Sequence, residues 1–116
     1  MKNLNSIIIS GKESLPLIEG GKGISVSSGK SSGAWAKAGG VGTFSGVNAD
    51  SYDENGNLIP QIYEEKTRTG RHRELIKFSV SGAVEQAKIA REILVSAVTK
   101  IALKSITAKP FKTKLK

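Results

Sequence analysis

LPLIEGGKGISVSS, residues 15–28, and GGVGTFSG, residues 39–46, are the two stretches that decide the fold of this chain. Each joins a short apolar run to a cluster of glycines. The run Leu15–Glu19 stops at a glycine pair, and the run Val41–Ser45 follows another pair. Short apolar runs bounded by glycine are typical of strands. We therefore predict a strand at each of these two positions.

A short helix is predicted between these strands. Residues 31–38, SSGAWAKA, hold three alanines and lead into Gly39 and Gly40, a stop that is typical of a helix end. The order strand, helix, strand within about 30 residues is that of a parallel βαβ unit. In front of this unit, the β-branched run NSIIIS, residues 5–10, predicts a small leading strand or hairpin arm.

The second half of the chain divides into a loop and a long helix. Residues 48–69 are polar and show no helical period, which predicts a long surface loop. From Arg71 to about Leu103, apolar residues recur at helical spacing and predict an amphipathic helix, which Gly82 is placed to kink or split. The expected apolar stripe consists of Val80, Val84, Ala87, Ala90, Leu94, Ala97 and Ile101. Beyond Ala108, KPFKTKLK predicts a frayed end.

The net charge of +8 comes mostly from the end of the chain. Residues 1–92 carry twelve Lys or Arg and all ten Asp or Glu, a balance of +2, and the other six positive charges are lysines after Glu92. No aromatic platform for nucleic-acid bases accompanies this tail, so we expect no specific nucleic-acid partner. A small basic protein that uses the tail on nucleic acid or on a membrane surface is the alternative function.

Composition disfavours several other classes of protein. The chain has no cysteine, which excludes disulfides and Cys-ligated metals, and its single histidine, His72, argues against a His-ligated metal. We therefore predict no metal site. No apolar run approaches the roughly 20 residues that span a bilayer, and the start of the chain lacks the apolar stretch of a signal peptide. We expect a cytoplasmic protein without a membrane span.

Three motifs with catalytic associations give weak signals. Gly23–Ser31 lies between a strand and a helix as a phosphate-binding P-loop does, but five residues separate its glycines where the Walker A pattern has four. His72 is interpreted as an exposed surface histidine. The acidic pairs Asp53-Glu54 and Glu64-Glu65 are interpreted as solvated loop charges. We assign no catalytic role to any of them.

The glycines after the two predicted strands are the better candidate for a binding site. Gly20, Gly21 and Gly23 follow the first strand, and Gly46 follows the second. Glycine lets the backbone approach a flat ligand closely, and ligands of parallel α/β proteins bind at the carboxyl ends of the strands. Tight turns are the alternative explanation for these glycines.

The segment as a whole resembles the start of the nitronate monooxygenase family, also known as 2-nitropropane dioxygenases. The resemblance covers about residues 4–93, because two glycine-rich strand ends, a small-residue helix and the loop NADSYDENGN occur in order. It implies a flavoprotein with a (β/α)₈ TIM barrel, an oxidoreductase that oxidises alkyl nitronates with FMN and O₂. Lys22 stands where many members of the wider family have methionine, which points to a bacterial subgroup.

The resemblance also implies a set of cofactor-binding residues. Gly21, Lys22 and Gly23 would lie against FMN from the first strand, and Ser45 and Gly46 would line the same pocket from the second. A cation at Lys22 would stabilise the negative charge of the reduced flavin. The family takes its catalytic histidine and its FMN phosphate loops from later units, and no residue here matches them.

The resemblance ends where a third barrel strand should follow the long helix. Leu94–Lys116 is lysine-rich and resembles nothing in the family. We therefore expect residues 1–93 to be an N-terminal part of the barrel and residues 94–116 to be a divergent, poorly ordered tail. The expected fold class is α/β, consisting of incomplete N-terminal βα units with a long amphipathic C-terminal helix. A shifted reading frame or an early stop would produce such a truncated fragment, inactive alone, whose partner would be a separately encoded remainder of the barrel.

Overall fold

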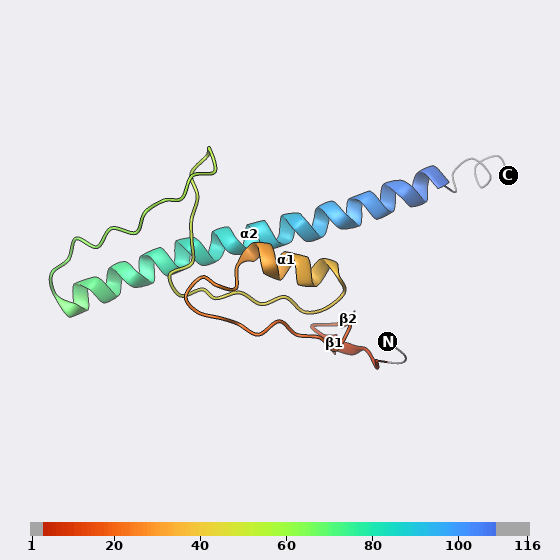
Figure 1. Ribbon diagram of the computed structural model, residues 1–116, viewed down its shortest axis with the longest axis horizontal. Helices are drawn as coiled ribbons and strands as arrows, with labels where there is room; N and C mark the ends of the chain where they lie inside the picture. The colour runs from red at the N-terminus through yellow and green to blue at the C-terminus, as the bar shows by residue number, and fades with distance from the viewer. Residues whose placement is uncertain (1–3, 109–116) are drawn as a thin grey trace.

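The protein has a mixed α/β structure with one small sheet and two helices. The computed structural model describes the backbone of residues 4–108 and the side-chain surroundings of residues 4–96. Its elements are β1 (Ile7–Ile9), β2 (Lys12–Ser14), α1 (Gly29–Lys37) and α2 (Arg68–Ala108). Figure 1 shows α1 beside the middle of α2, and the connection between the two helices as a long excursion that returns to the start of α2.

The leading strand predicted within residues 5–10 is confirmed as one arm of a hairpin. β1 and β2 pair antiparallel, with Ile7 opposite Ser14 and Ile9 opposite Lys12. The two residues between them, Ser10 and Gly11, both have positive φ, 49° and 74°. A two-residue connection of this kind suits the right-handed twist of paired strands.

The two segments that were predicted as strands, Leu15–Glu19 and Val41–Ser45, lie parallel but form no regular strands. A single parallel bridge joins Ile18 to Val41. Around it, the N–H of Val41 donates to the Leu17 carbonyl at 2.8 Å, and the N–H of Glu19 donates to the Val41 carbonyl at 2.9 Å. The direction of pairing is the one expected for a βαβ unit. The pairing stays short because, within residues 4–108, no further strand pairs with either segment.

Helix α1 begins two residues before the predicted start because a serine pair caps it. The Ser31 N–H donates to Ser28 Oγ at 3.3 Å, and the Ser28 N–H donates to Ser31 Oγ at 3.1 Å, which is a reciprocal capping box. Gly39 follows the C-terminal end of the helix with a φ of 96°, in agreement with the predicted glycine stop.

Helix α2 is longer than predicted at both ends, and Gly82 does not interrupt it. Thr67 caps its start, since Thr67 Oγ1 accepts the N–H of Gly70 at 3.0 Å and the Thr67 carbonyl accepts the N–H of Arg71 at 2.9 Å. Gly82 is buried instead against the connecting segment, where an added Cβ would lie 1.8 Å from the carbonyl oxygen of Ala49. The expected kink or split at Gly82 is therefore wrong, because this glycine serves a close backbone crossing.

The predicted apolar stripe of α2 is largely the wrong face of the helix. Val80 and Val84 are 60% and 51% exposed, and Leu94 is 37% exposed. The face that packs in the molecule carries small and polar residues, of which Gly82 and Gln86 are buried. Of the predicted stripe, Ala90 lies on this packed face, Ala87 is exposed, and Ala97 and Ile101 are outside the described side chains.

The helices approach each other through small residues. On α1, an added Cβ at Gly29 would lie 2.1 Å from the Gln86 carbonyl oxygen, and one at Gly33 would lie 3.0 Å from the Ala90 carbonyl oxygen. Because the two backbones lie so close, α1 packs against the side of α2 that carries small side chains. Periodicity weighs side-chain size and hydropathy, so it selects the opposite, valine-rich side.

The core is small and partly polar. Among the described side chains, Ala49 is the buried hydrophobic one, and Glu19, Ser27, Ser32 and Gln86 are buried polar ones. The radius of gyration is 19.3 Å, whereas a compact domain of this length has about 13 Å. Much apolar surface is therefore left uncovered by this chain.

The predicted division between residues 93 and 94 falls inside α2, which runs on to Ala108. Residues 94–108 of the expected tail are thus part of this helix. Residues 109–116, where a frayed end was expected, lie outside the described residues.

Candidate functional site

The candidate site is the edge where the two parallel segments end. The loop of residues 20–28 leaves the first segment there and leads into α1. Ser27, which is only 3% exposed, closes this loop through its hydroxyl: Ser27 Oγ donates to the Gly20 carbonyl at 3.1 Å and accepts the Lys22 N–H at 2.7 Å. The Ser27 carbonyl in turn accepts the N–H of Ser45 at 3.0 Å. The glycine-rich loop is therefore tied to the second segment.

Glu19 is the residue of this edge that sequence reasoning missed. Its carboxylate is 8% exposed and accepts hydrogen bonds from Ser31 Oγ at 2.7 Å and from the Thr43 N–H at 3.2 Å. One acidic side chain thereby joins the first segment, the start of α1 and the second segment. A glutamate followed by paired glycines was visible in the sequence, but nothing in the spacing marked it as buried.

The glycines of the molecule form two groups. At Gly29, Gly42 and Gly82 an added Cβ would lie 2.1, 2.0 and 1.8 Å from a backbone oxygen, so packing requires glycine there. At the site edge the situation is the opposite. An added Cβ at Gly20 meets nothing within 4 Å, and at Gly21 and Gly23 the nearest atoms are 3.9 and 3.8 Å away.

Neither packing nor backbone conformation requires glycine at positions 20, 21 and 23. The glycines with positive φ are Gly11, Gly39 and Gly56, all away from this loop. Residues 23–26 also form a turn, but Gly20, Gly21 and Gly23 have no positive φ, so this turn does not need glycine. Backbone without side chains at an open edge offers space for a flat group to approach.

The structure brings most of the residues assigned by resemblance to one edge. Gly21 lies beside Thr43 and Gly23 beside Ser45, because the two segments run parallel. Lys22 lies between the two glycines with its side chain exposed and its backbone held by Ser27. Gly46 is placed differently: an added Cβ would lie 3.6 Å from the Cβ of Ala83, so this glycine faces α2.

The segment that was compared with a P-loop has a structural role. Ser28 caps α1, and the N–H of Gly29 donates to the buried Gln86 Oε1 at 2.7 Å. Gln86 also donates from Nε2 to the Asp50 carbonyl at 2.8 Å. The backbone donor that would be free in a phosphate-binding loop is thus engaged with α2.

The remaining polar candidates lie in exposed positions. His72 and the acidic pairs at 53–54 and 64–65 are all exposed. The Asp53 carboxylate accepts the N–H groups of Asn55 and Asn57 at 2.9 and 2.8 Å, and the backbone hydrogen bond from Asn57 is the largest cause that lowers the pKa of Asp53. Asp53 therefore shapes the turn at residues 53–57.

Two kinds of site are not found in the described part of the chain. It contains no group of three or more His, Cys, Asp or Glu side chains arranged to hold a metal ion. None of its helices combines the length and apolar character needed to cross a membrane. Comparison with known proteins adds no relative, since no protein-family model, curated protein or solved structure matches this chain.

Proposed function

We propose that residues 4–93 form the N-terminal βα portion of an FMN-dependent, nitronate monooxygenase-like oxidoreductase, and that the chain does not turn over substrate by itself. The observation that supports this best is the open glycine edge. At 20, 21 and 23 the molecule has three glycines that neither its own packing nor its φ angles require. A flat ligand that must come close to the backbone provides the missing reason.

The residues present at the edge fit one face of a flavin ring. FMN, when bound, supplies the redox chemistry by which such enzymes oxidise alkyl nitronates with O₂. The chain's part is to approach the ring with Gly21 and Gly23 and to offer the Ser45 hydroxyl beside Gly23. Lys22 adds a positive charge that favours the reduced, more negative form of the ring.

The uncovered apolar surface supports a larger assembly around this portion. Ile18, Ile24 and Val26 near the edge are 57%, 62% and 65% exposed, and Val80 and Val84 on α2 are exposed as well. Contiguous apolar surface on a soluble protein marks a place where other structure packs. The proposal therefore includes further βα units that cover these faces and complete the flavin site.

The experiment is a residue-resolved NMR titration of the full chain with FMN. We expect weak binding, with Kd above about 100 µM, because the ring is contacted from one side. Shift changes should concentrate at residues 20–23 and 43–46. Submicromolar binding, or oxidation of an alkyl nitronate by the purified chain, would contradict the inactivity part of the proposal.

A matched set of glycine variants tests the assignment of the edge itself. The double variant Gly21→Ala/Gly23→Ala adds two methyl groups where the protein has room, so folding should be unchanged while the FMN-induced shifts at the edge are lost. Gly20→Ala adds one methyl group to the same open edge, also without a clash, and should weaken these shifts. If the double variant responds to FMN as the parent chain does, the edge is not the flavin surface.

A further inference from the structure

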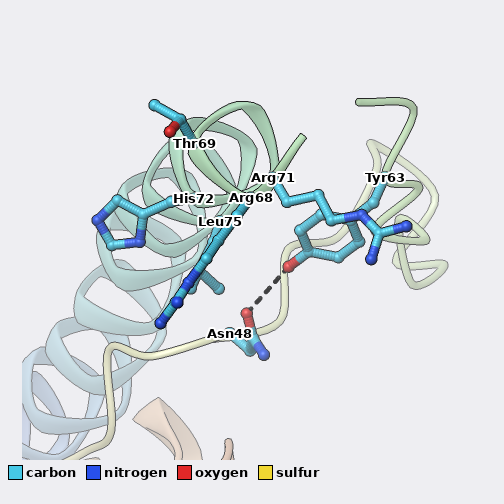
Figure 2. A pocket seen from close by; sticks show the side chains of 7 residues that line it. All are labelled: Asn48, Tyr63, Arg68, Thr69, Arg71, His72 and Leu75. Carbon is cyan, nitrogen blue, oxygen red and sulfur yellow. Dashed lines mark hydrogen bonds between the residues drawn. The ribbon is translucent and has the colours of Figure 1, made fainter. Parts of the chain in front are cut away.

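A cavity lies at the start of α2 and is lined by none of the glycines of the candidate edge. It is open, has a volume of about 770 Å³, and is lined by Asn48, Tyr63, Arg68, Thr69, Arg71, His72 and Leu75. Figure 2 shows Arg68, Arg71 and His72 extending from the first turns of α2, with the Arg71 guanidinium group beside the Tyr63 ring and with His72 and Arg68 on the other side of the view. The volume is in the range of small-molecule sites.

The charge of this cavity is one-sided. Its lining contains two guanidinium groups and an imidazole but no carboxylate. The neighbouring cavity on the same helix is different, since Glu65 and Glu74 line it together with Arg73 and Lys77. The cavity of Arg68 and Arg71 is thus the place on this surface where cations gather without acidic neighbours in the lining.

One acidic side chain of α2, Glu74, is held outside the cavity by the loop. The Glu74 carboxylate accepts the N–H groups of Glu64 and Glu65 at 3.0 and 3.3 Å. Arg71 donates from Nε to the Glu65 carbonyl at 3.0 Å, and its guanidinium group lies beside the Tyr63 ring (Figure 2). The backbone N–H groups of Gly70 and Arg71 are already bonded to Thr67, so side chains make this site.

The opposite wall is aromatic and fixed in place. The Tyr63 ring packs edge-on against Phe78, with 5.3 Å between ring centroids and 72° between planes. Its hydroxyl is 3.2 Å from Asn48 Oδ1, and the Asn48 N–H donates to Ser79 Oγ at 3.2 Å. A held ring, with Leu75 in the same lining, offers an apolar surface beside the two arginines.

We propose that this cavity binds an organic phosphate monoester, with the phosphate on Arg68 and Arg71 and the organic group against Tyr63 and Leu75. Guanidinium groups match phosphate oxygens in paired hydrogen bonds. Positions 68 and 71 are neighbours on one face of α2, from which two long, exposed arginine side chains can reach a single phosphate of nearly two negative charges. A carboxylate carries one charge and two oxygens, so it uses this arrangement less well. The inference goes beyond the flavin edge and does not depend on it.

The test is an NMR titration of the full chain with phenyl phosphate at constant ionic strength. We expect shift changes at Asn48, Tyr63 and residues 68–75, and weaker binding of both inorganic phosphate and benzoate. Arg68→Gln and Arg71→Gln should each weaken phenyl phosphate binding about tenfold, since each removes a charge-assisted hydrogen bond. Because different signals report on this cavity and on the glycine edge, failure of one proposal is distinguishable from failure of the other.

The matched control is Arg73→Gln, which removes the same charge from the same turn but lines the other cavity. It should change the affinity less than twofold. Equal weakening by all three variants would show diffuse attraction to a basic surface and would overturn the proposal, as would equal binding of benzoate. Arg71→Lys keeps the positive charge but lacks the paired donors of a guanidinium group, and circular dichroism checks that its helix content is unchanged. If this variant binds phenyl phosphate as tightly as the parent chain, the paired hydrogen-bond geometry is refuted.

Discussion

Gly82→Ala is the substitution that most directly tests how α2 crosses the connecting segment. An added Cβ would lie 1.8 Å from the Ala49 carbonyl oxygen and 2.5 Å from its carbonyl carbon. Real Cβ atoms stay at least 3.0 Å from such neighbours, so backbone must shift by more than an ångström. No flexible side chain can absorb this movement, because the obstructing atoms belong to the main chain.

The expected magnitude follows from two opposing effects. Alanine in place of glycine in an exposed helix stabilises it by about 1 kcal/mol. Overpacking a fitted contact costs about 1–3 kcal/mol or more, and here the displaced residue, Ala49, is the buried hydrophobic side chain of the described core. Because the clash requires a shift of more than an ångström, the cost lies at the upper end of that range, and we expect net destabilisation of about 2 kcal/mol, which is a large part of the stability of a small domain.

The assay is urea unfolding of the full chain followed by circular dichroism, with hydrogen exchange of the α1 amides as a second readout. Gly21→Ala is the matched control, because its added Cβ has 3.9 Å of clearance and should change the unfolding free energy by less than about 0.5 kcal/mol. A Gly82→Ala chain that is as stable as the parent, or more stable, would refute the close crossing of α2 over Ala49.

Two further predictions concern polar groups. Gln86→Leu removes the partners of the Gly29 N–H and the Asp50 carbonyl, and because Gln86 is 4% exposed, we expect thermal unfolding to show a loss of about 1–3 kcal/mol, whereas the exposed Ser81→Ala should be near neutral. For Asp53, the folded pKa is lowered from 3.8 chiefly by the Asn57 N–H, so its contribution to the turn is present above the unfolded pKa and is lost as pH falls through the folded value. The Asn57 amide signal should therefore titrate with a midpoint below 3.8, and Asp53→Asn should abolish that titration; a midpoint at or above 3.8 would contradict the hydrogen-bonded turn.

Local sequence signals predicted the elements whose causes are local. The hairpin arm, the short helix before Gly39 and the approximate position of the long helix follow from a β-branched run, a glycine stop and helical periodicity. The parallel direction of the two glycine-rich segments was also predicted, because a helix between two strands allows it. The sequence did not predict that these segments would fail to form regular strands. A regular ladder needs neighbouring strands, which residues 4–108 do not provide.

Among the residues of the candidate sites, too, those with local signals were predicted and those that join distant segments were not. Gly21 and Gly23 were identified from their place after a predicted strand and Ser45 from the family resemblance, and the structure brings these three residues to one edge. The roles of Glu19 and Gln86 escaped prediction, because each connects segments that are distant in sequence. The basic cavity escaped for the same reason: Asn48 and Tyr63 become neighbours of Arg68 and Arg71 when the connecting segment returns to α2.

The amino-acid sequence was enough to locate the helices to within a few residues and to mark the stretches with unusual glycine, since these depend on spacing along the backbone and on φ freedom. Tertiary structure alone decided which glycines are packed and which are open, and which face of α2 is covered. Val80 and Val84 are more hydrophobic than Gly82, yet the face with Gly82 is the covered one. The backbone of the connecting segment at Ala49 can contact α2 only at a position without a side chain.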